Sequence, residues 1–252
     1  MLVSPRAAPS GSRTFPVGDG RTVELVSPGG PGTDPLLARV ASAIEGAVVA
    51  VEQFWGTDWQ RNIVVEATES DTQFATRAHL DPNRQWTDIA AVAVADQVDP
   101  VGRTASGQRI VLAPGAAGMS DEALRIVLTH ELFHFAARAD TALDAPRWLT
   151  EGVADFVARR PEPIPADAAT DAALPSDPEL DSPGPQRSAG YDRAWWFARF
   201  IGDEFGVDGL RRLYRQACGP EHGDFAGAVD KALGIDMTAL QMRWGQWLAK
   251  AR

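Results

Sequence analysis

The stretch VLTHELFHFAARA, residues 127–139, constrains this chain more than any other feature. His130 and His134 are four residues apart, and Glu131 directly follows the first of them. The residues between and around them are largely apolar, namely Leu128, Leu132, Phe133 and Phe135. A helix that is apolar nearly all round should be buried. Two histidines and a glutamate buried without partners would cost several kcal/mol, so we expect the fold to supply a partner.

A metal ion is the partner that this spacing favours. Side chains at i and i+4 share one face of a helix, so both imidazoles can bind one Zn²⁺ at about 2.0–2.1 Å. Glu131 is displaced around the helix and would lie beside the ion, where it can take a proton from zinc-bound water. The chain has only 4 histidines, and two of them stand in this motif. The competing interpretation is a metal-free set of core polar residues.

A catalytic zinc site also needs a third protein ligand. The spacing H-E-x-x-H-x-x-G-x-x-H is not completed, because Ala137 and Asp140 stand where that pattern has glycine and histidine. Further along the chain, WLTEGVADFVA places Glu151 on the next expected helix. A helical hairpin of this length can return Glu151 to the first helix. Asp155, four residues later, falls on the same face as Glu151.

Composition excludes several classes of partner and site. The net charge of −10 argues against nucleic acid and against an anionic membrane surface. The single cysteine, Cys218, excludes an intrachain disulfide and a cysteine-rich zinc site. No apolar run approaches the roughly 18 residues of a membrane span. The first residues lack the apolar core of a signal peptide, although we favour an extracytoplasmic location, secreted or envelope-anchored.

The first part of the chain predicts a small α/β lobe over residues 21–119, preceded by a flexible tail at 1–20. Alternating or buried apolar runs indicate strands. These runs cover residues 21–27, 62–68, 88–95 and 109–114. Helical periodicity covers residues 33–56, and residues 70–79 indicate a second, short helix. We expect a mixed or antiparallel sheet.

From Ser120 onward the pattern is helical, which predicts a second lobe over residues 120–252. Ser120 is the expected N-cap of the motif helix. Expected helices cover residues 120–139, 146–160, 191–206, 207–217, 224–233 and 237–251. Residues 160–190 are rich in proline and acidic residues and predict a long loop, either a disordered excursion or a lid. The fold class is therefore α+β, with both lobes forming one domain overall.

These motifs resemble those of the gluzincin metallopeptidases, of which thermolysin is the familiar member. HELFH followed by WLTEGVADF matches their H-E-x-x-H helix and downstream glutamate, and W-L-x-E-G looks like the small bacterial peptidases of the MA-like type. The resemblance implies a zincin-like fold with one zinc ion held by His130, His134 and Glu151. It makes Glu131 the general base. Asp155 would accept a hydrogen bond from a ligand histidine and fix its tautomer.

A gluzincin also needs a hydrogen-bond donor for the developing oxyanion, and Tyr191 and His222 are the candidates. The alternative for Tyr191 is an ordinary core or surface aromatic, and for His222 a solvated turn residue. Gly152, directly after Glu151, would let another backbone come close. The alternative for Gly152 is a simple irregularity of the helix.

The sequence thus predicts a monomeric, zinc-dependent metallopeptidase that acts on a peptide or protein. The absence of G-x-M-x-N, a motif of aminopeptidases, favours an endopeptidase. The alternative function is a non-catalytic, zincin-fold binding protein of the cell envelope. Glu131 argues for the enzyme, because a protein that had lost catalysis would be expected to lack one of the four site residues.

Overall fold

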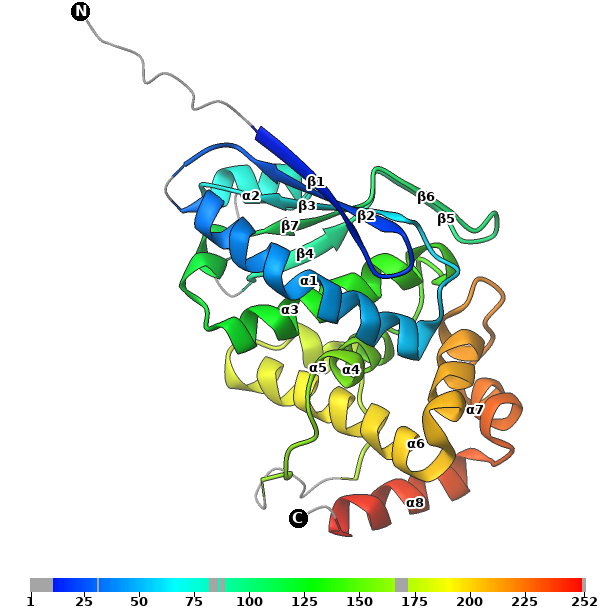
Figure 1. Cartoon of the computed structure of the whole chain (residues 1–252). Coiled ribbons are helices and arrows are strands. Elements are labelled where there is room, and N and C mark those ends of the chain that lie inside the picture. Colours follow the sequence, from blue (N-terminus) through cyan, green and yellow to red (C-terminus); the bar gives the residue numbers. More distant parts are fainter. Residues whose placement is uncertain (1–10, 31, 82–85, 87–88, 166–171, 251–252) are drawn as a thin grey trace, which may run out of the picture. The chain divides into compact units, whose positions relative to one another are not determined.

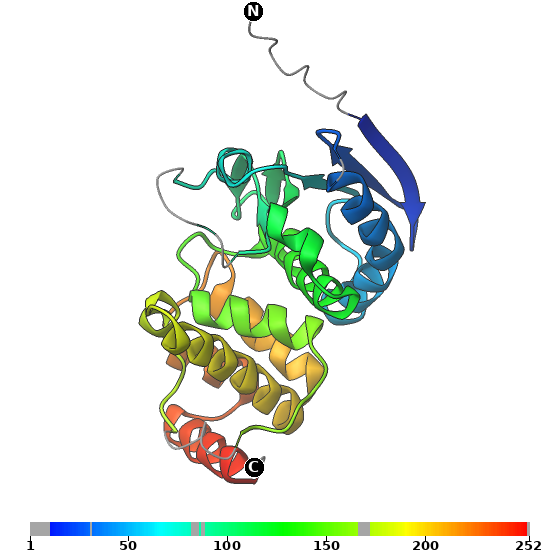
Figure 2. The ribbon, with the colours of Figure 1, turned by 90° about the vertical axis from the view of Figure 1, so that its left-hand side faces the viewer.

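The computed structural model describes residues 11–30, 32–81, 86, 89–165 and 172–250. The chain forms two compact units, which are described separately below (Figures 1 and 2). The first unit consists of Met1–Val98 and Ala105–Ala136, and the second of Asp99–Thr104 and Ala137–Arg252. The division into lobes expected from the sequence stays a prediction.

A five-stranded sheet organises the first unit, in the order β1-β2-β3-β7-β4. Its central pairs, β2 with β3 and β3 with β7, are parallel, whereas the edge strands pair antiparallel, so the sheet is mixed. The strands are β1 (Gly11–Val17), β2 (Arg21–Ser27), β3 (Asn62–Ala67), β4 (Ala91–Val94) and β7 (Arg109–Leu112). The four expected strand segments are therefore confirmed, with β4 shorter than expected.

Strand β1 corrects the flexible tail that we expected over residues 1–20. Residues 11–17 pair along their whole length with β2, from Gly11 opposite Ser27 to Val17 opposite Arg21. Gly18 and Gly20 take positive φ values, 53° and 90°, which allow the tight turn between the strands. β1 is exposed over most of its length, so it lacks the alternating apolar pattern that identifies a strand. Residues 1–10 of the expected tail lie outside the described residues.

The helices of the first unit are α1 (Thr33–Trp55), α2 (Asp71–Arg77) and α3 (Asp121–Ala137), with a 3₁₀ turn η1 (Pro114–Gly118) before α3. Ser120 starts α3 as expected, because its Oγ accepts the backbone N–H of Ala123 at 3.2 Å. Edge-to-face contacts of Phe54 and Trp55 with Phe133 pack α1 against α3. The motif helix is thereby fixed to the body that carries the sheet.

The second unit is helical. Its helices are α4 (Arg147–Ala158), α5 (Asp177–Asp181), α6 (Pro185–Cys218), α7 (Phe225–Leu233) and α8 (Met237–Lys250), with a 3₁₀ turn η2 (Arg138–Asp140). The short strands β5 (Gln97–Asp99) and β6 (Thr104–Ser106), which we did not expect, form a separate two-stranded sheet. Asp99–Thr104 of this hairpin belong to the second unit, and the other residues of the two strands belong to the first. Gly206, with φ 75°, breaks α6 where the sequence indicated the boundary between two helices. The tryptophans Trp195, Trp196, Trp244 and Trp247 are buried in the core.

The expected long loop over residues 160–190 is wrong in part. It contains α5, and α6 already begins at Pro185. Ile164 and Leu180 are buried, at 3% exposure each. A capping box between Ser176 and Glu179 starts α5. The surrounding prolines and acidic residues leave no apolar periodicity from which this helix could be predicted. Residues 166–171 of the expected loop lie outside the described residues.

Candidate metal centre

Helix α3 carries the motif on a single half-buried polar face. His130, Glu131 and His134 are each partly exposed. The apolar residues of the motif are fully buried around the rest of the helix, namely Leu128, Leu132, Phe133 and Phe135. The helix is therefore buried on its apolar sides, as the sequence predicted, while the three polar side chains remain within reach of a ligand.

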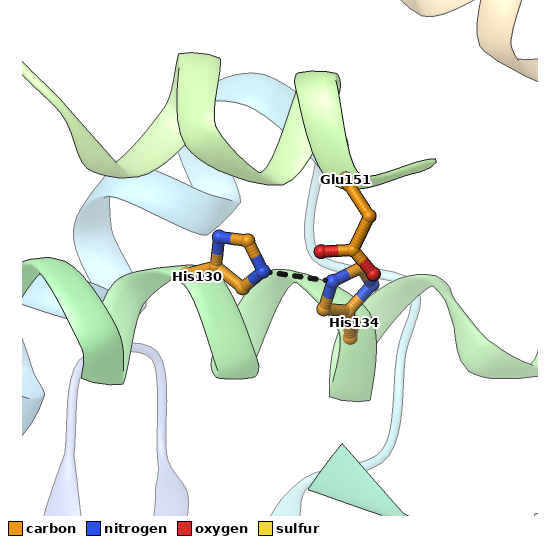
Figure 3. A group of neighbouring side chains, drawn as sticks. All are labelled: His130, His134 and Glu151. Carbon is orange, nitrogen blue, oxygen red and sulfur yellow. Dashed lines mark hydrogen bonds between the residues drawn. The ribbon is translucent and has the colours of Figure 1, made fainter. Parts of the chain in front are cut away.

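The two histidines of α3 point at each other. Their Nε2 atoms lie 3.1 Å apart, and their ring centroids are separated by 4.8 Å (Figure 3). Two ligands of a tetrahedral zinc ion with bonds of about 2.0–2.1 Å are separated by roughly 3.3–3.4 Å. The spacing of the imidazole nitrogens therefore fits a shared metal ion.

Glu131 contacts the edge of the sheet. Its Oε2 accepts a hydrogen bond of 2.7 Å from the backbone N–H of Ala93, on edge strand β4. Charge-assisted bonds of this length hold a carboxylate in one orientation. The sequence did not identify Ala93, because a backbone N–H belongs to every non-proline residue and leaves no signal in the side chain.

Glu151 lies near the start of α4, in the second unit, and Gly152 sets how closely α4 packs on α6. A Cβ at Gly152 would lie 2.3 Å from the carbonyl oxygen of Ala194 on α6. Only glycine allows this approach, so the expectation that another backbone comes close to Gly152 is confirmed. The α4 backbone next to Glu151 is thus held directly against α6.

His130, His134 and Glu151 form a group that could hold a metal ion. One nitrogen from each imidazole and one carboxylate oxygen all lie within 4.8 Å of one another. Figure 3 shows the Glu151 carboxylate directed toward the two imidazoles. Within the described residues this is the one such cluster of three or more histidine, cysteine or carboxylate side chains. Two imidazoles and one carboxylate are a ligand set typical of catalytic zinc.

Asp155, expected to support a ligand histidine, is buried at 9% exposure. Its Oδ2 lies 3.4 Å from Nη1 of Arg159, one turn further along the chain. Arg159 was not among the residues expected at the site, although its i+4 spacing from Asp155 is a sequence signal for this ion pair. The hydrogen bond from Asp155 to a histidine stays a prediction.

The two expected oxyanion donors have different surroundings. Tyr191, on α6, is half-buried. Burial, followed by the negative charge of Glu151, raises the pKa of Tyr191 to about 12, so its hydroxyl keeps its proton at neutral pH. His222 lies in the turn after α6, and its Nε2 is 3.2 Å from Oδ1 of Asp144. The raised pKa of His222 has this carboxylate as its largest cause.

Comparisons with known proteins show a similarity in fold. No protein-family model matches the chain. No curated protein matches it either. Among solved structures it is similar to a point mutant of a two-domain M1 zinc metallopeptidase bound to L-arginine, with a TM-score of 0.50 and 15% identity over 95% of this chain. Two structures of an M1 zinc metallopeptidase from Deinococcus radiodurans have TM-scores of 0.47 and 0.48 at 16% and 15% identity, over the same 95%.

The chain spans about half the length of these structures, 52% of each. At this identity the likeness concerns the fold alone, and the fold is like that of a zinc metallopeptidase. The similar structures are M1 zinc metallopeptidases, which are a gluzincin family, so the thermolysin-like part of the sequence resemblance is not supported. None of the helices in the described part of the chain is long and apolar enough to cross a bilayer.

Proposed function

We propose that this chain is a zinc-dependent peptidase in which His130, His134 and Glu151 hold one zinc ion. The observation that carries the proposal is the grouping of these three side chains, with donor atoms within 4.8 Å. The 3.1 Å separation of the imidazole nitrogens supports the same interpretation, because it is close to the separation that tetrahedral zinc requires. The fold of the similar M1 zinc metallopeptidase supports it independently of the side chains.

Zinc bound to these residues would act as a Lewis acid toward the peptide carbonyl and would acidify a water molecule. Glu131 is the general base that takes the proton of the attacking water, and the N–H of Ala93 holds its carboxylate in place. Tyr191 keeps its phenolic proton at neutral pH and serves as the donor to the developing oxyanion. Asp155 orients a ligand histidine by accepting its N–H.

The substrate class is a peptide or protein, and we favour internal cleavage over removal of single N-terminal residues. The support for the class is that the similar structures are named zinc metallopeptidases. The support for internal cleavage is that the chain lacks the G-x-M-x-N motif of aminopeptidases. Peptides blocked at the N-terminus provide the test, since an endopeptidase cleaves them and an aminopeptidase does not.

The decisive experiment is metal quantification on the purified protein, with wild type, His134→Ala and His79→Ala compared. His79 is a matched control, because it is a histidine with a side chain 53% exposed and lies outside the group. We expect about one zinc per chain for wild type and for His79→Ala, and a large loss for His134→Ala. Equal zinc contents in all three proteins, or no uptake by wild type when zinc is added, would show that the group is not a zinc site.

Glu131→Gln separates the peptidase from the non-catalytic binding protein. Glutamine preserves the shape of the side chain and removes the proton acceptor, so zinc content should be kept and peptide hydrolysis lost. A wild type that binds zinc but cleaves no peptide in a mixed library would favour the non-catalytic function. Unchanged turnover in the variant would show that Glu131 is not the base.

A further inference from the structure

Asp155 is a buried carboxylate on the same helix as Glu151, one turn further along. Its side chain is 12% exposed. A carboxylate taken out of water needs a cation or several hydrogen bonds to offset its lost hydration. The contacts that fix the Asp155 side chain therefore also set the direction of its carboxylate. This carboxylate lies one helical turn from Glu151, a proposed zinc ligand.

Arg159 is the cation that meets Asp155. The two residues are joined twice, because the backbone N–H of Arg159 donates to the Asp155 carbonyl at 2.9 Å and Nη1 lies 3.4 Å from Oδ2. The same Nη1 lies 3.1 Å from Oδ1 of Asp192 on α6. One guanidinium thus bridges a carboxylate of α4 and a carboxylate of α6.

The planar face of the Arg159 guanidinium is also packed against an aromatic ring. Its central carbon lies 3.7 Å from the ring centroid of Trp195, a residue of α6 that is 3% exposed. An arginine stacked on an indole and bonded at its edge has little rotational freedom, and its planar fork is pre-organised. Arg159 can therefore hold Asp155 more firmly than a solvated surface pair could.

We propose that Arg159 is a positioning residue for the zinc site and that it acts through Asp155. This inference rests on the proposed function. Arg159 binds one side of the Asp155 carboxylate, aligns it, and so keeps it in the orientation that supports a metal ligand. Without the arginine, Asp155 would turn toward another partner. This change weakens its support of the site, and losses of such support typically cost about 10- to 100-fold in metal affinity.

Arg199 provides a matched control. It is an arginine near the same indole, with its central carbon 5.1 Å from the Trp195 ring centroid. Its Nη1 donates to the carbonyl oxygen of Glu162 at 2.6 Å. A loss of packing on Trp195 should affect both arginine variants, whereas a loss of support for Asp155 should affect only Arg159.

The test is a double-mutant cycle on zinc affinity, measured by competition with a chromophoric chelator on the metal-free full chain. The proteins are wild type, Arg159→Met, Asp155→Asn, the double variant and Arg199→Met, with folding checked by circular dichroism. We expect Arg159→Met and Asp155→Asn each to raise the zinc Kd about tenfold. The double variant should bind no more weakly than Asp155→Asn, and Arg199→Met should bind as wild type.

An unchanged or tighter Kd in Arg159→Met would overturn the inference, and so would a double variant whose loss equals the product of the single losses. If Arg159→Met does not fold, Arg159→Lys replaces it in the same cycle, because lysine keeps the charge and loses the planar fork. A multiplicative loss with the lysine variant also overturns the inference. A wild type that takes up no zinc overturns the proposed function as well, whereas normal zinc uptake with multiplicative effects overturns the inference alone.

Discussion

The backbone N–H of Ala93 donates to Oε2 of Glu131 at 2.7 Å and so joins the edge strand of the sheet to the proposed general base. The contribution of this hydrogen bond to stability can be tested on the metal-free protein. Glutamine at position 131 can still accept from Ala93, whereas alanine removes this hydrogen bond to a buried residue. We expect metal-free Glu131→Ala to be about 1–2 kcal/mol less stable than metal-free Glu131→Gln in urea unfolding. Equal midpoints for the two variants would mean that the bond contributes nothing.

Tyr191→Phe should reduce turnover and leave binding unchanged. The phenolic proton of Tyr191 is retained at neutral pH, and a donor to the oxyanion acts only as the reaction proceeds. Loss of such a donor typically lowers kcat by about 10²- to 10³-fold. The steady-state constants on an N-terminally blocked peptide check this, with zinc content as the control. A His222→Gln variant that loses as much kcat, while Tyr191→Phe keeps its own, would assign the role to His222 instead.

Gly152→Ala should destabilise the second unit, because the new Cβ would overlap the carbonyl oxygen of Ala194 at 2.3 Å and that atom is backbone. Overpacking of this kind costs about 1–3 kcal/mol. Gly46→Ala is the matched control. Gly46 lies in the exposed part of α1, and a Cβ there would meet no atom within 4 Å. We expect this variant to gain roughly 0.5–1 kcal/mol from helix propensity. Relative to wild type, we expect the urea midpoint to fall in Gly152→Ala and to rise in Gly46→Ala.

Asp177 connects α5 to the start of the Glu151 helix. Its carboxylate accepts the backbone N–H groups of Arg147 at 3.2 Å and of Trp148 at 2.7 Å, so it caps α4 from a distant part of the sequence. Asp177→Ala should cost about 1 kcal/mol of unfolding free energy. Asp181→Ala is the control, because it removes an exposed ion pair with Arg147 that we expect to contribute less than half as much. Similar losses in both variants would argue against the cap.

The sequence predicted the parts of the site that depend on side-chain type and helical spacing. The i, i+4 histidines, the downstream Glu151 and the close approach at Gly152 follow from local patterns, and the structure groups or packs all of them. The Ala93 bond could not be predicted, because it joins a backbone group to a side chain 38 residues away. A contact that positions the site through a backbone group therefore required coordinates.

The same limit explains the errors in the fold. Strand β1 is held by its register with β2 and has an exposed pattern, so apolar alternation does not identify it. Helix α5 is five residues long and begins next to a proline, so its sequence resembles a loop. Both elements are stabilised by partners elsewhere in the chain, which for α5 include the α4 backbone bonded to Asp177. Helices with a clear apolar periodicity in their own sequence, such as α1 and α3, were predicted correctly.

The Asp144–His222 pair should make stability depend on pH. Each partner shifts the pKa of the other, with that of His222 raised from 6.5 and that of Asp144 lowered from 3.8. The histidine contribution is fully present below pH 6.5 and is lost as the pH rises through the higher folded pKa. The aspartate contribution is fully present above pH 3.8 and is lost as the pH falls through the lower folded pKa. The pair therefore stabilises the fold most between about pH 4 and 6.5.

Asp144→Asn should consequently lower the thermal midpoint at pH 5.5 by roughly 1–2 °C, and the difference from wild type should shrink at pH 9. Asp208→Asn is the control, because Asp208 pairs at 2.8 Å with Arg211, which stays protonated across this range. Its difference from wild type should be the same at both pH values. Midpoints from calorimetry on the metal-free proteins check this. A difference for Asp144→Asn that does not vary between pH 5.5 and 9 would show that the protonation of His222 is not coupled to folding through this pair.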